Sequence, residues 1–189
     1  MRLSTLPMMG KVLVIVALMG TGAAGLGALG LYTATGLRGA VVKIDRAGLI
    51  GFLEDHGFGK MYAESDQNSM LVRVEENILR RTSRERIKDF VLNYVRDLGT
   101  ERGAAVIDAL LRGANVYFSE ALFEFLSPLE LDFHRDTSDT AFFYYRNGFV
   151  EVTAEGFELH PYEELDGVIW EGQIIGREFE DLTYEETSG

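Results

Sequence analysis

The segment from Thr82 to Gly99 constrains the fold most, because it has the clearest helical pattern in the chain. Thr82 and Glu85 have the spacing of a capping box, and Gly99 is a typical residue at a helix end. Between them, apolar residues recur at spacings of three and four, which places them on one stripe of a helix. These residues are Ile87, Phe90, Val91, Tyr94, Val95 and Leu98. The pattern predicts a central helix between a small N-terminal and a larger C-terminal α+β part.

The rest of the soluble part predicts a short helix and two strands, then further helices in the middle, and a run of strands after them. Helices are expected at 45–56, 101–112 and 116–126, and strands at 60–64, 70–75, 131–133, 141–145, 149–153, 157–160 and 168–175. Asn147-Gly148 between two apolar runs is a strong hairpin signal. The expected fold class is α+β: an N-terminal transmembrane-like helix, a small helical cluster and an antiparallel β meander. The expected organisation is a segment 1–40, a soluble domain 41–178 and an acidic tail 179–189.

The N-terminal segment has no charged residue from Val12 to Leu37. About 20 helical residues cross the core of a bilayer, so this run is long enough to span one. We therefore expect a membrane anchor through residues 12–37, with the soluble domain on the cytoplasmic side. Its Gly and Ala content would also allow two such helices to associate closely. Two alternatives are a cleaved signal peptide, and a cytoplasmic protein in which the first 40 or so residues are not native to the fold.

Composition excludes several classes of chemistry. The chain has no Cys, so disulfides, thiolate catalysis and cysteine-ligated zinc are absent. Its formal net charge is −12, which opposes nucleic-acid binding through the overall field. Gly59-Lys60 is followed by Met61 and lacks the spacing of a phosphate-binding loop. The sequence predicts no catalytic residue and no cofactor.

Three groups of residues are candidates for binding. The basic cluster Arg80, Arg81, Arg84 and Lys88 could contact nucleic acid, although a solvated surface gives the same pattern. The carboxylates Glu130, Asp132 and Asp136 could hold a metal ion if 131–133 is a strand, as in an active primase. The aromatic run 142–145 could stack bases, although alternate residues of a strand also pack in a core. Trp170 is expected to be a core or interface anchor.

Residues 45–180 resemble a known arrangement. The stretches that carry the resemblance are LIGFLEDHGFGKMY (49–62), RIKDFVLNYVRDL (86–98) and the segment 133–180, of which 136–177 is the most specific part. They are similar to the region that precedes the ATPase in primase–helicase replication proteins of phages and prophage-like elements, which have a superfamily 3, poxvirus primase-like helicase. Here the chain stops where the ATPase would follow, and it begins with an added apolar segment.

This resemblance implies a non-catalytic accessory domain in the DNA replication of a mobile element, which binds nucleic acid or a replication partner. A truncated gene product and a domain reused on a membrane anchor are both compatible with it. The alternative function is a membrane-anchored acidic protein-interaction domain with no nucleic-acid role.

Overall fold

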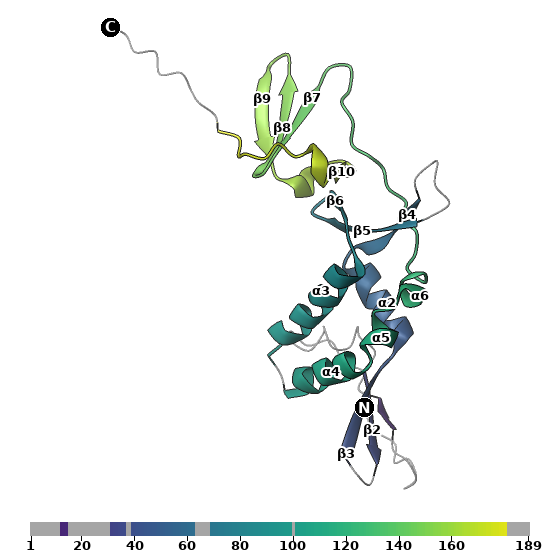
Figure 1. The fold of residues 1–189 in the computed structure, drawn as a ribbon. Helices are drawn as coiled ribbons and strands as arrows, with labels where there is room; N and C mark the ends of the chain where they lie inside the picture. The colour runs from purple at the N-terminus through teal and green to yellow at the C-terminus, as the bar shows by residue number, and fades with distance from the viewer. Residues whose placement is uncertain (1–11, 15–30, 37–38, 63–68, 100, 181–189) are drawn as a thin grey trace, which may run out of the picture. The chain divides into compact units, whose positions relative to one another are not determined.

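A computed structural model of the chain describes residues 12–14, 31–36, 39–62, 69–99 and 101–180. The chain separates into two compact units. The first unit comprises the residues up to Val72 together with Thr82–Pro128, and the second comprises Arg73–Arg81 and the residues from Leu129 onward. The predicted soluble domain 41–178 thus contains parts of both units. The α+β fold class is confirmed (Figure 1).

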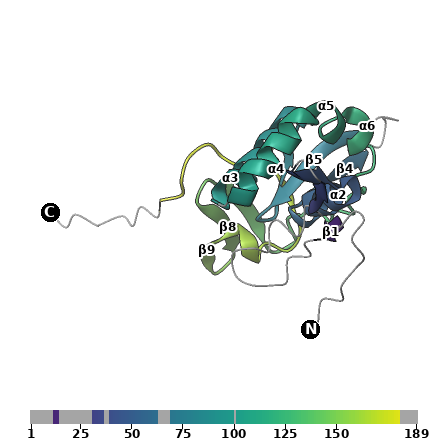
Figure 2. The same cartoon turned by 90° about the horizontal axis from the view of Figure 1, so that it is seen from below.

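The first unit is mainly helical. Its helices are α2 (Arg46–Asp55), α3 (Arg84–Asp97), α4 (Glu101–Arg112) and the single turns α5 (Ala114–Tyr117) and α6 (Glu120–Phe123). α3 and α4 pack side by side, as Figure 2 shows. An antiparallel sheet in the order β1-β2-β3 contains β1 (Val12–Val14), β2 (Leu31–Gly36) and β3 (Gly39–Ile44). β4 (Phe58–Tyr62) is hydrogen-bonded to β5 (Ser69–Glu75), which continues into the second unit.

Apolar side chains from α2, α3, α4 and α6, together with residues of β3 and β4, form one buried core in the first unit. Phe52, Phe58, Val91 and Leu110 are among its most deeply buried members. The stripe predicted on α3 faces this core, with Phe90 and Tyr94 half-buried at its margin. Helix packing around a common apolar core is therefore the main source of order in this unit.

The second unit consists of strands and short 3₁₀ turns. β6 (Ile78–Arg81) pairs with β5 and, in parallel, with β10 (Ile169–Trp170). A separate antiparallel meander contains β7 (Ala141–Tyr145), β8 (Gly148–Thr153) and β9 (Gly156–His160), as Figure 1 shows. The turns η1 (Tyr162–Glu164) and η2 (Glu171–Gln173) flank β10. A smaller core of Ile78, Tyr144, Phe149, Tyr162, Leu165 and Ile169 joins these elements.

Several sequence predictions differ from the structure in detail. The α3 cap is Ser83 and not Thr82, because the Ser83 hydroxyl accepts the Arg86 amide at 3.4 Å. Hydrogen bonds from the first-turn amide and from Ser83 also lower the pKa of Glu85. Gly99 does end this helix, with a left-handed φ of +58°.

The helix expected at 116–126 is broken into α5 and α6, because Ser119 accepts the Leu122 amide at 3.1 Å and starts a new turn. The strand expected at 131–133 is an isolated bridge between Phe133 and Val168. The strand expected at 168–175 is limited to β10 and is followed by η2. β6 was not predicted, because its turn residues Glu76 and Asn77 lack the usual Asn-Gly signal.

Most of the predicted membrane span lies outside the described residues. Its described ends, Val12–Val14 and Leu31–Gly36, are strands where a helix was expected. Among the residues that the structure describes, no helix is both long and apolar enough to cross a membrane. The acidic tail predicted at 179–189 is described only as far as residue 180.

Candidate binding surface

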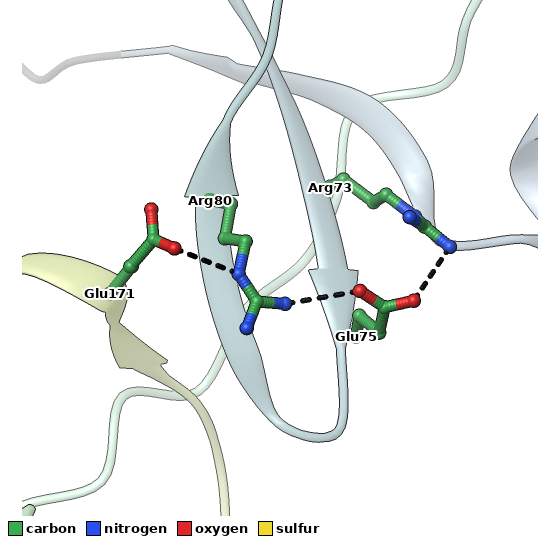
Figure 3. A network of polar contacts seen from close by, with 4 residues as sticks. All are labelled: Arg73, Glu75, Arg80 and Glu171. Carbon is green, nitrogen blue, oxygen red and sulfur yellow. Dashed lines mark hydrogen bonds and ion pairs between the residues drawn. The ribbon is translucent and has the colours of Figure 1, made fainter. Parts of the chain in front are cut away.

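Arg80, the first member of the basic cluster, is already paired with two carboxylates. Its Nη1 lies 3.2 Å from Glu75 Oε2 and its Nε lies 3.0 Å from Glu171 Oε1 (Figure 3). Glu75 also pairs with Arg73 at 2.9 Å, so the network links β5, β6 and η2. These two carboxylates neutralise the charge of Arg80 and occupy two of its nitrogens, which weakens its attraction for a phosphate and with it the nucleic-acid interpretation.

The other three basic residues are divided between the units. Arg81 is exposed at the end of β6 in the second unit. Arg84 and Lys88 lie on α3 in the first unit. Arg84 lines a cavity of about 460 Å³ together with Lys60, Glu120 and Glu124, and Lys88 lies 3.6 Å from Asp89. Each of these two sites therefore combines basic and acidic groups.

The three predicted metal-ligating carboxylates are exposed in the second unit. Asp136 Oδ1 accepts the Phe142 amide at 3.0 Å, and the Asp132 backbone accepts the Val168 amide at 2.8 Å. Glu130 lies in the irregular segment before the Phe133 bridge. Within the described ranges, no three His, Asp or Glu side chains are grouped so that they could hold a metal ion.

The aromatic run on β7 divides between the two faces of the meander. Phe142 and Tyr144 point to the core face, where Phe142 packs edge-on against His134 with ring centroids 4.3 Å apart. Burial and the Asp136 carboxylate raise the pKa of Tyr144. This half of the run is therefore structural, as alternation along a strand predicts.

The opposite face of the meander is apolar and partly exposed. The strand register aligns Ala141, Val152 and Phe157 in one row, and Phe143, Val150 and Leu159 in the next. Phe143, Phe157 and Leu159 are exposed, whereas Val150 in the middle strand is buried. We call this surface the outer face of the meander.

The segment 175–179 covers one part of the outer face. The Ile175 amide donates to the Tyr144 carbonyl at 2.8 Å. The Phe179 ring lies 5.3 Å from the Tyr145 ring and 5.6 Å from the Phe157 ring, measured between centroids. Asn147 fixes Phe179 because its side-chain amide accepts the Phe179 N–H at 2.8 Å and donates to the Phe179 carbonyl at 3.1 Å.

Two polar side chains, those of Asn77 and Tyr162, connect distant parts of the second unit by hydrogen bonds to backbone carbonyls. Asn77 Nδ2 donates to the carbonyls of Tyr162 at 3.1 Å and Leu165 at 3.0 Å. The Tyr162 hydroxyl donates to the Tyr145 carbonyl at 2.6 Å. Burial, with a smaller contribution from Tyr144, raises the pKa of Tyr162 to about 12. The sequence indicates Asn147 as a turn residue but gives no signal for its bonds to Phe179 or for the role of Asn77, because these partners are distant in the sequence.

Trp170 agrees with its expected role as an anchor. It is half-buried, and its ring lies 6.3 Å from Phe133 in a stacked arrangement. Its backbone amide donates to Gln173 Oε1 at 2.9 Å, which fixes the start of η2.

The first unit has an apolar groove between α2 and α6. Ala47, Ile50, Gly51, Leu122 and Phe125 line this groove of about 430 Å³, with Arg46 and Glu54 beside them. Phe125 is 76 % exposed. Because one basic and one acidic residue lie beside it, this groove has no preference for a basic or an acidic partner.

Charge separates the two units sharply. The residues of the first unit include 12 Lys and Arg against 12 Asp and Glu, whereas those of the second include six against 18. The whole formal net charge of −12 therefore belongs to the second unit. Its surface should attract positively charged partners and repel polyanions.

Comparison of the chain with protein families, curated proteins and solved structures gives no match.

Proposed function

We propose that the chain is a non-catalytic accessory domain that binds a protein partner in the replication of a mobile element. The resemblance of residues 45–180 to the region preceding a superfamily 3 ATPase leaves two classes of partner open, nucleic acid and protein. The distribution of charge favours the protein, because the second unit carries the entire −12 charge.

The ion pairs of Arg80 with Glu75 and Glu171 also favour a protein partner over nucleic acid. Its guanidinium already has carboxylate partners at 3.0 and 3.2 Å, so it offers little to a phosphate backbone. Arg84 and Lys88 belong to the charge-balanced first unit, where acidic groups accompany them. Nucleic-acid binding would thus rest on few unopposed cations, although affinity for DNA depends on neutralising many phosphates.

The decisive experiment compares the two partner classes directly. Fluorescence anisotropy of the full chain with labelled single- and double-stranded oligonucleotides should give no saturable binding at 150 mM NaCl. In parallel, chemical cross-linking in the native host, read by mass spectrometry, should join residues 129–180 to a protein of the replication assembly.

A specific result would overturn this proposal. Saturable DNA binding that falls steeply with salt, and is abolished when Arg80, Arg81, Arg84 and Lys88 are all changed to Glu, would establish the nucleic-acid function instead. Cross-links confined to membrane proteins unrelated to replication would favour the alternative, a membrane-anchored acidic interaction domain.

Membrane attachment through residues 12–37 is a separate part of the proposal. It rests on the uncharged run from Val12 to Leu37, which is long enough to span a bilayer. Fractionation of the full chain with a carbonate wash tests it, together with the N-terminal mass of the recovered protein. Retention in the membrane with the N-terminus intact is the expected result, and a soluble protein would contradict it.

A further inference from the structure

β9 ends the meander with an open edge. The sheet order is β7-β8-β9, and no described strand pairs with the other side of β9. The opposite edge, formed by β7, is contacted by Ile175, whose amide donates to the Tyr144 carbonyl. Among the described residues, the backbone of the β7 edge is thus hydrogen-bonded to a further segment, whereas β9 is the last strand of its sheet (Figure 1).

The hairpin register determines which backbone groups of β9 face outward. The turn Ala154-Glu155 is closed by the Thr153–Gly156 pair, and pairs Glu151–Glu158 and Phe149–His160 follow at intervals of two. A two-residue turn is closed by a hydrogen-bonded pair, and such pairs alternate along an antiparallel ladder. The N–H and C=O groups of Phe157 and Leu159 therefore point away from β8.

The side chains beside this edge carry two different chemistries. Phe157 and Leu159 are 54 % and 41 % exposed on the outer face. Glu158, between them, projects to the opposite face, and its side chain is 80 % exposed. Edge strands are commonly protected by charged side chains, Pro or a bulge; β9 contains no Pro or bulge, and Glu158 is its exposed charged side chain.

Successive residues of a strand added to β9 would lie alternately beside the apolar side chains and beside the acidic one. Residues on one of its faces would lie beside Phe157 and Leu159, and the residue between them would lie opposite Glu158. Glu151 and Glu164 approach the same side of the sheet, since both lie within 4 Å of His160. The matching segment thus alternates apolar residues with Lys or Arg.

A second copy of the chain fits this edge poorly. Antiparallel pairing of two β9 strands centred on Glu158 would place the two Glu158 carboxylates directly opposite each other. Like charges in that position destabilise a sheet. The charge of the edge therefore selects a basic partner over self-association.

We propose that the open edge of β9 is the docking site for an extended segment of a partner protein in which apolar residues alternate with Lys or Arg. The segment adds a fourth strand to the meander, with main-chain hydrogen bonds to Phe157 and Leu159 and an ion pair to Glu158. This inference names the binding surface of the protein interaction proposed above and rests on that function.

The test uses the full chain and a fluorescein-labelled peptide containing Val-Lys-Val-Lys-Val. We expect saturable binding with a Kd in the range of about 10–100 µM at 50 mM NaCl. The peptide Val-Glu-Val-Glu-Val, with the same backbone propensity, should not bind. Absence of binding by the lysine peptide, or equal binding by both peptides, would overturn the docking site.

Two variant pairs locate the peptide on the edge. Glu158→Lys should weaken binding at least about tenfold, whereas the same charge change at the exposed η1 residue, Glu163→Lys, should weaken it less than about twofold. Leu159→Pro removes one outward N–H and should also weaken binding about tenfold, whereas Leu159→Ala keeps the N–H and should have a smaller effect. Unchanged Trp170 fluorescence would show that each variant is folded.

The outcomes separate this inference from the proposed function. Peptide binding that is unaffected by Glu158→Lys and Leu159→Pro overturns the edge site but leaves the protein-binding function, which the cross-linking experiment decides. A dimer of the free chain that Leu159→Pro dissociates, detected by analytical ultracentrifugation, would assign the edge to a second copy and overturn the basic partner.

Discussion

The two units of this chain differ in the interactions that stabilise their folds. The first is charge-balanced, and 16 of its described residues form one buried apolar cluster. The second carries all the net charge, and six of its described residues form the corresponding cluster. Side chains that bind distant backbone groups, namely Asn77, Asn147 and Tyr162, supplement this smaller cluster, whereas in the first unit similar contacts of Lys60 and Glu54 accompany a much larger one. A unit with little apolar core can thus hold a fixed shape, and at the same time present a strongly acidic surface, if specific polar contacts replace part of the packing.

The largest expected effect is the loss of a core aromatic from the first unit. Phe52 is 1 % exposed, and its ring lies 4.8 Å from Tyr94. Phe52→Ala should lower the free energy of unfolding by about 3–5 kcal/mol, since it removes buried surface and leaves a cavity. Urea denaturation followed by far-UV circular dichroism measures this change. The exposed Phe125 provides the control, because Phe125→Ala should cost less than about 0.5 kcal/mol.

The second unit should instead be sensitive to the loss of a polar side chain. Asn77→Ala removes the side-chain hydrogen bonds to the carbonyls of Tyr162 and Leu165, and a longer one to Glu163, and places Ala at a φ of +59°. We expect a loss of about 2 kcal/mol, followed by Trp170 fluorescence. Asn77→Gly, which tolerates that φ, should cost less. A loss below about 0.5 kcal/mol for Asn77→Ala would contradict the idea that polar contacts hold this unit.

A smaller effect is expected from the hydroxyl of Tyr162. Tyr162→Phe leaves the Tyr145 carbonyl without its donor at 2.6 Å, at a cost of about 1–2 kcal/mol. Because the folded pKa of about 12 lies above the ordinary value of 10, the unfolded chain loses this proton first. The stabilisation of the folded state by the protonated Tyr162 hydroxyl is therefore complete below pH 10, and it is lost as the pH rises from 10 to about 12.

Urea titrations at pH 8, 10 and 11.5 measure this dependence. Over that range the wild-type chain should lose stability more steeply than Tyr162→Phe. Parallel pH profiles of the two proteins would show that Tyr162 does not supply the difference.

The smallest expected effect is that of salt. Raising NaCl from about 20 to 500 mM screens repulsion among the 18 carboxylates of the second unit and should stabilise it by less than about 1 kcal/mol. The charge-balanced first unit should change less. Amide hydrogen exchange in β8 and α3 measures both units in one sample. If salt changes the protection of β8 and α3 equally, charge repulsion does not distinguish the stability of the two units.

The parts of the fold that the sequence could predict depend on local signals. The α3 stripe and the Asn147-Gly148 hairpin were predicted because each is encoded within a few consecutive residues. The β5–β6 hairpin was missed because Glu76 and Asn77 take positive φ without a glycine. Parallel pairing of Ile169 with Ile78 joins residues 91 positions apart, and no local pattern indicates it.

The candidate surfaces show the same limit. The sequence placed Arg80 in a basic cluster, but Glu75 and Glu171 neutralise it. This pairing forms only because β5, β6 and η2 lie together in the folded unit. Alternation predicted that the aromatic run would divide between two faces, yet only the register with β8 and β9 shows that Phe157 and Leu159 join Phe143 on the outer one. Chemistry carried by single residues could be anticipated, whereas surfaces assembled from several strands could not.

The clamp that Asn147 forms on Phe179 sets a practical limit on how the chain can be shortened. A sequence-based boundary at residue 178 would remove the backbone that both Asn147 amide atoms bind, and with it the ring that packs on Tyr145 and Phe157. The shortened protein would gain an uncovered apolar patch around Tyr145 and Phe157, and exposed apolar patches promote aggregation. A fragment intended for spectroscopy or crystallisation should therefore extend through Phe179.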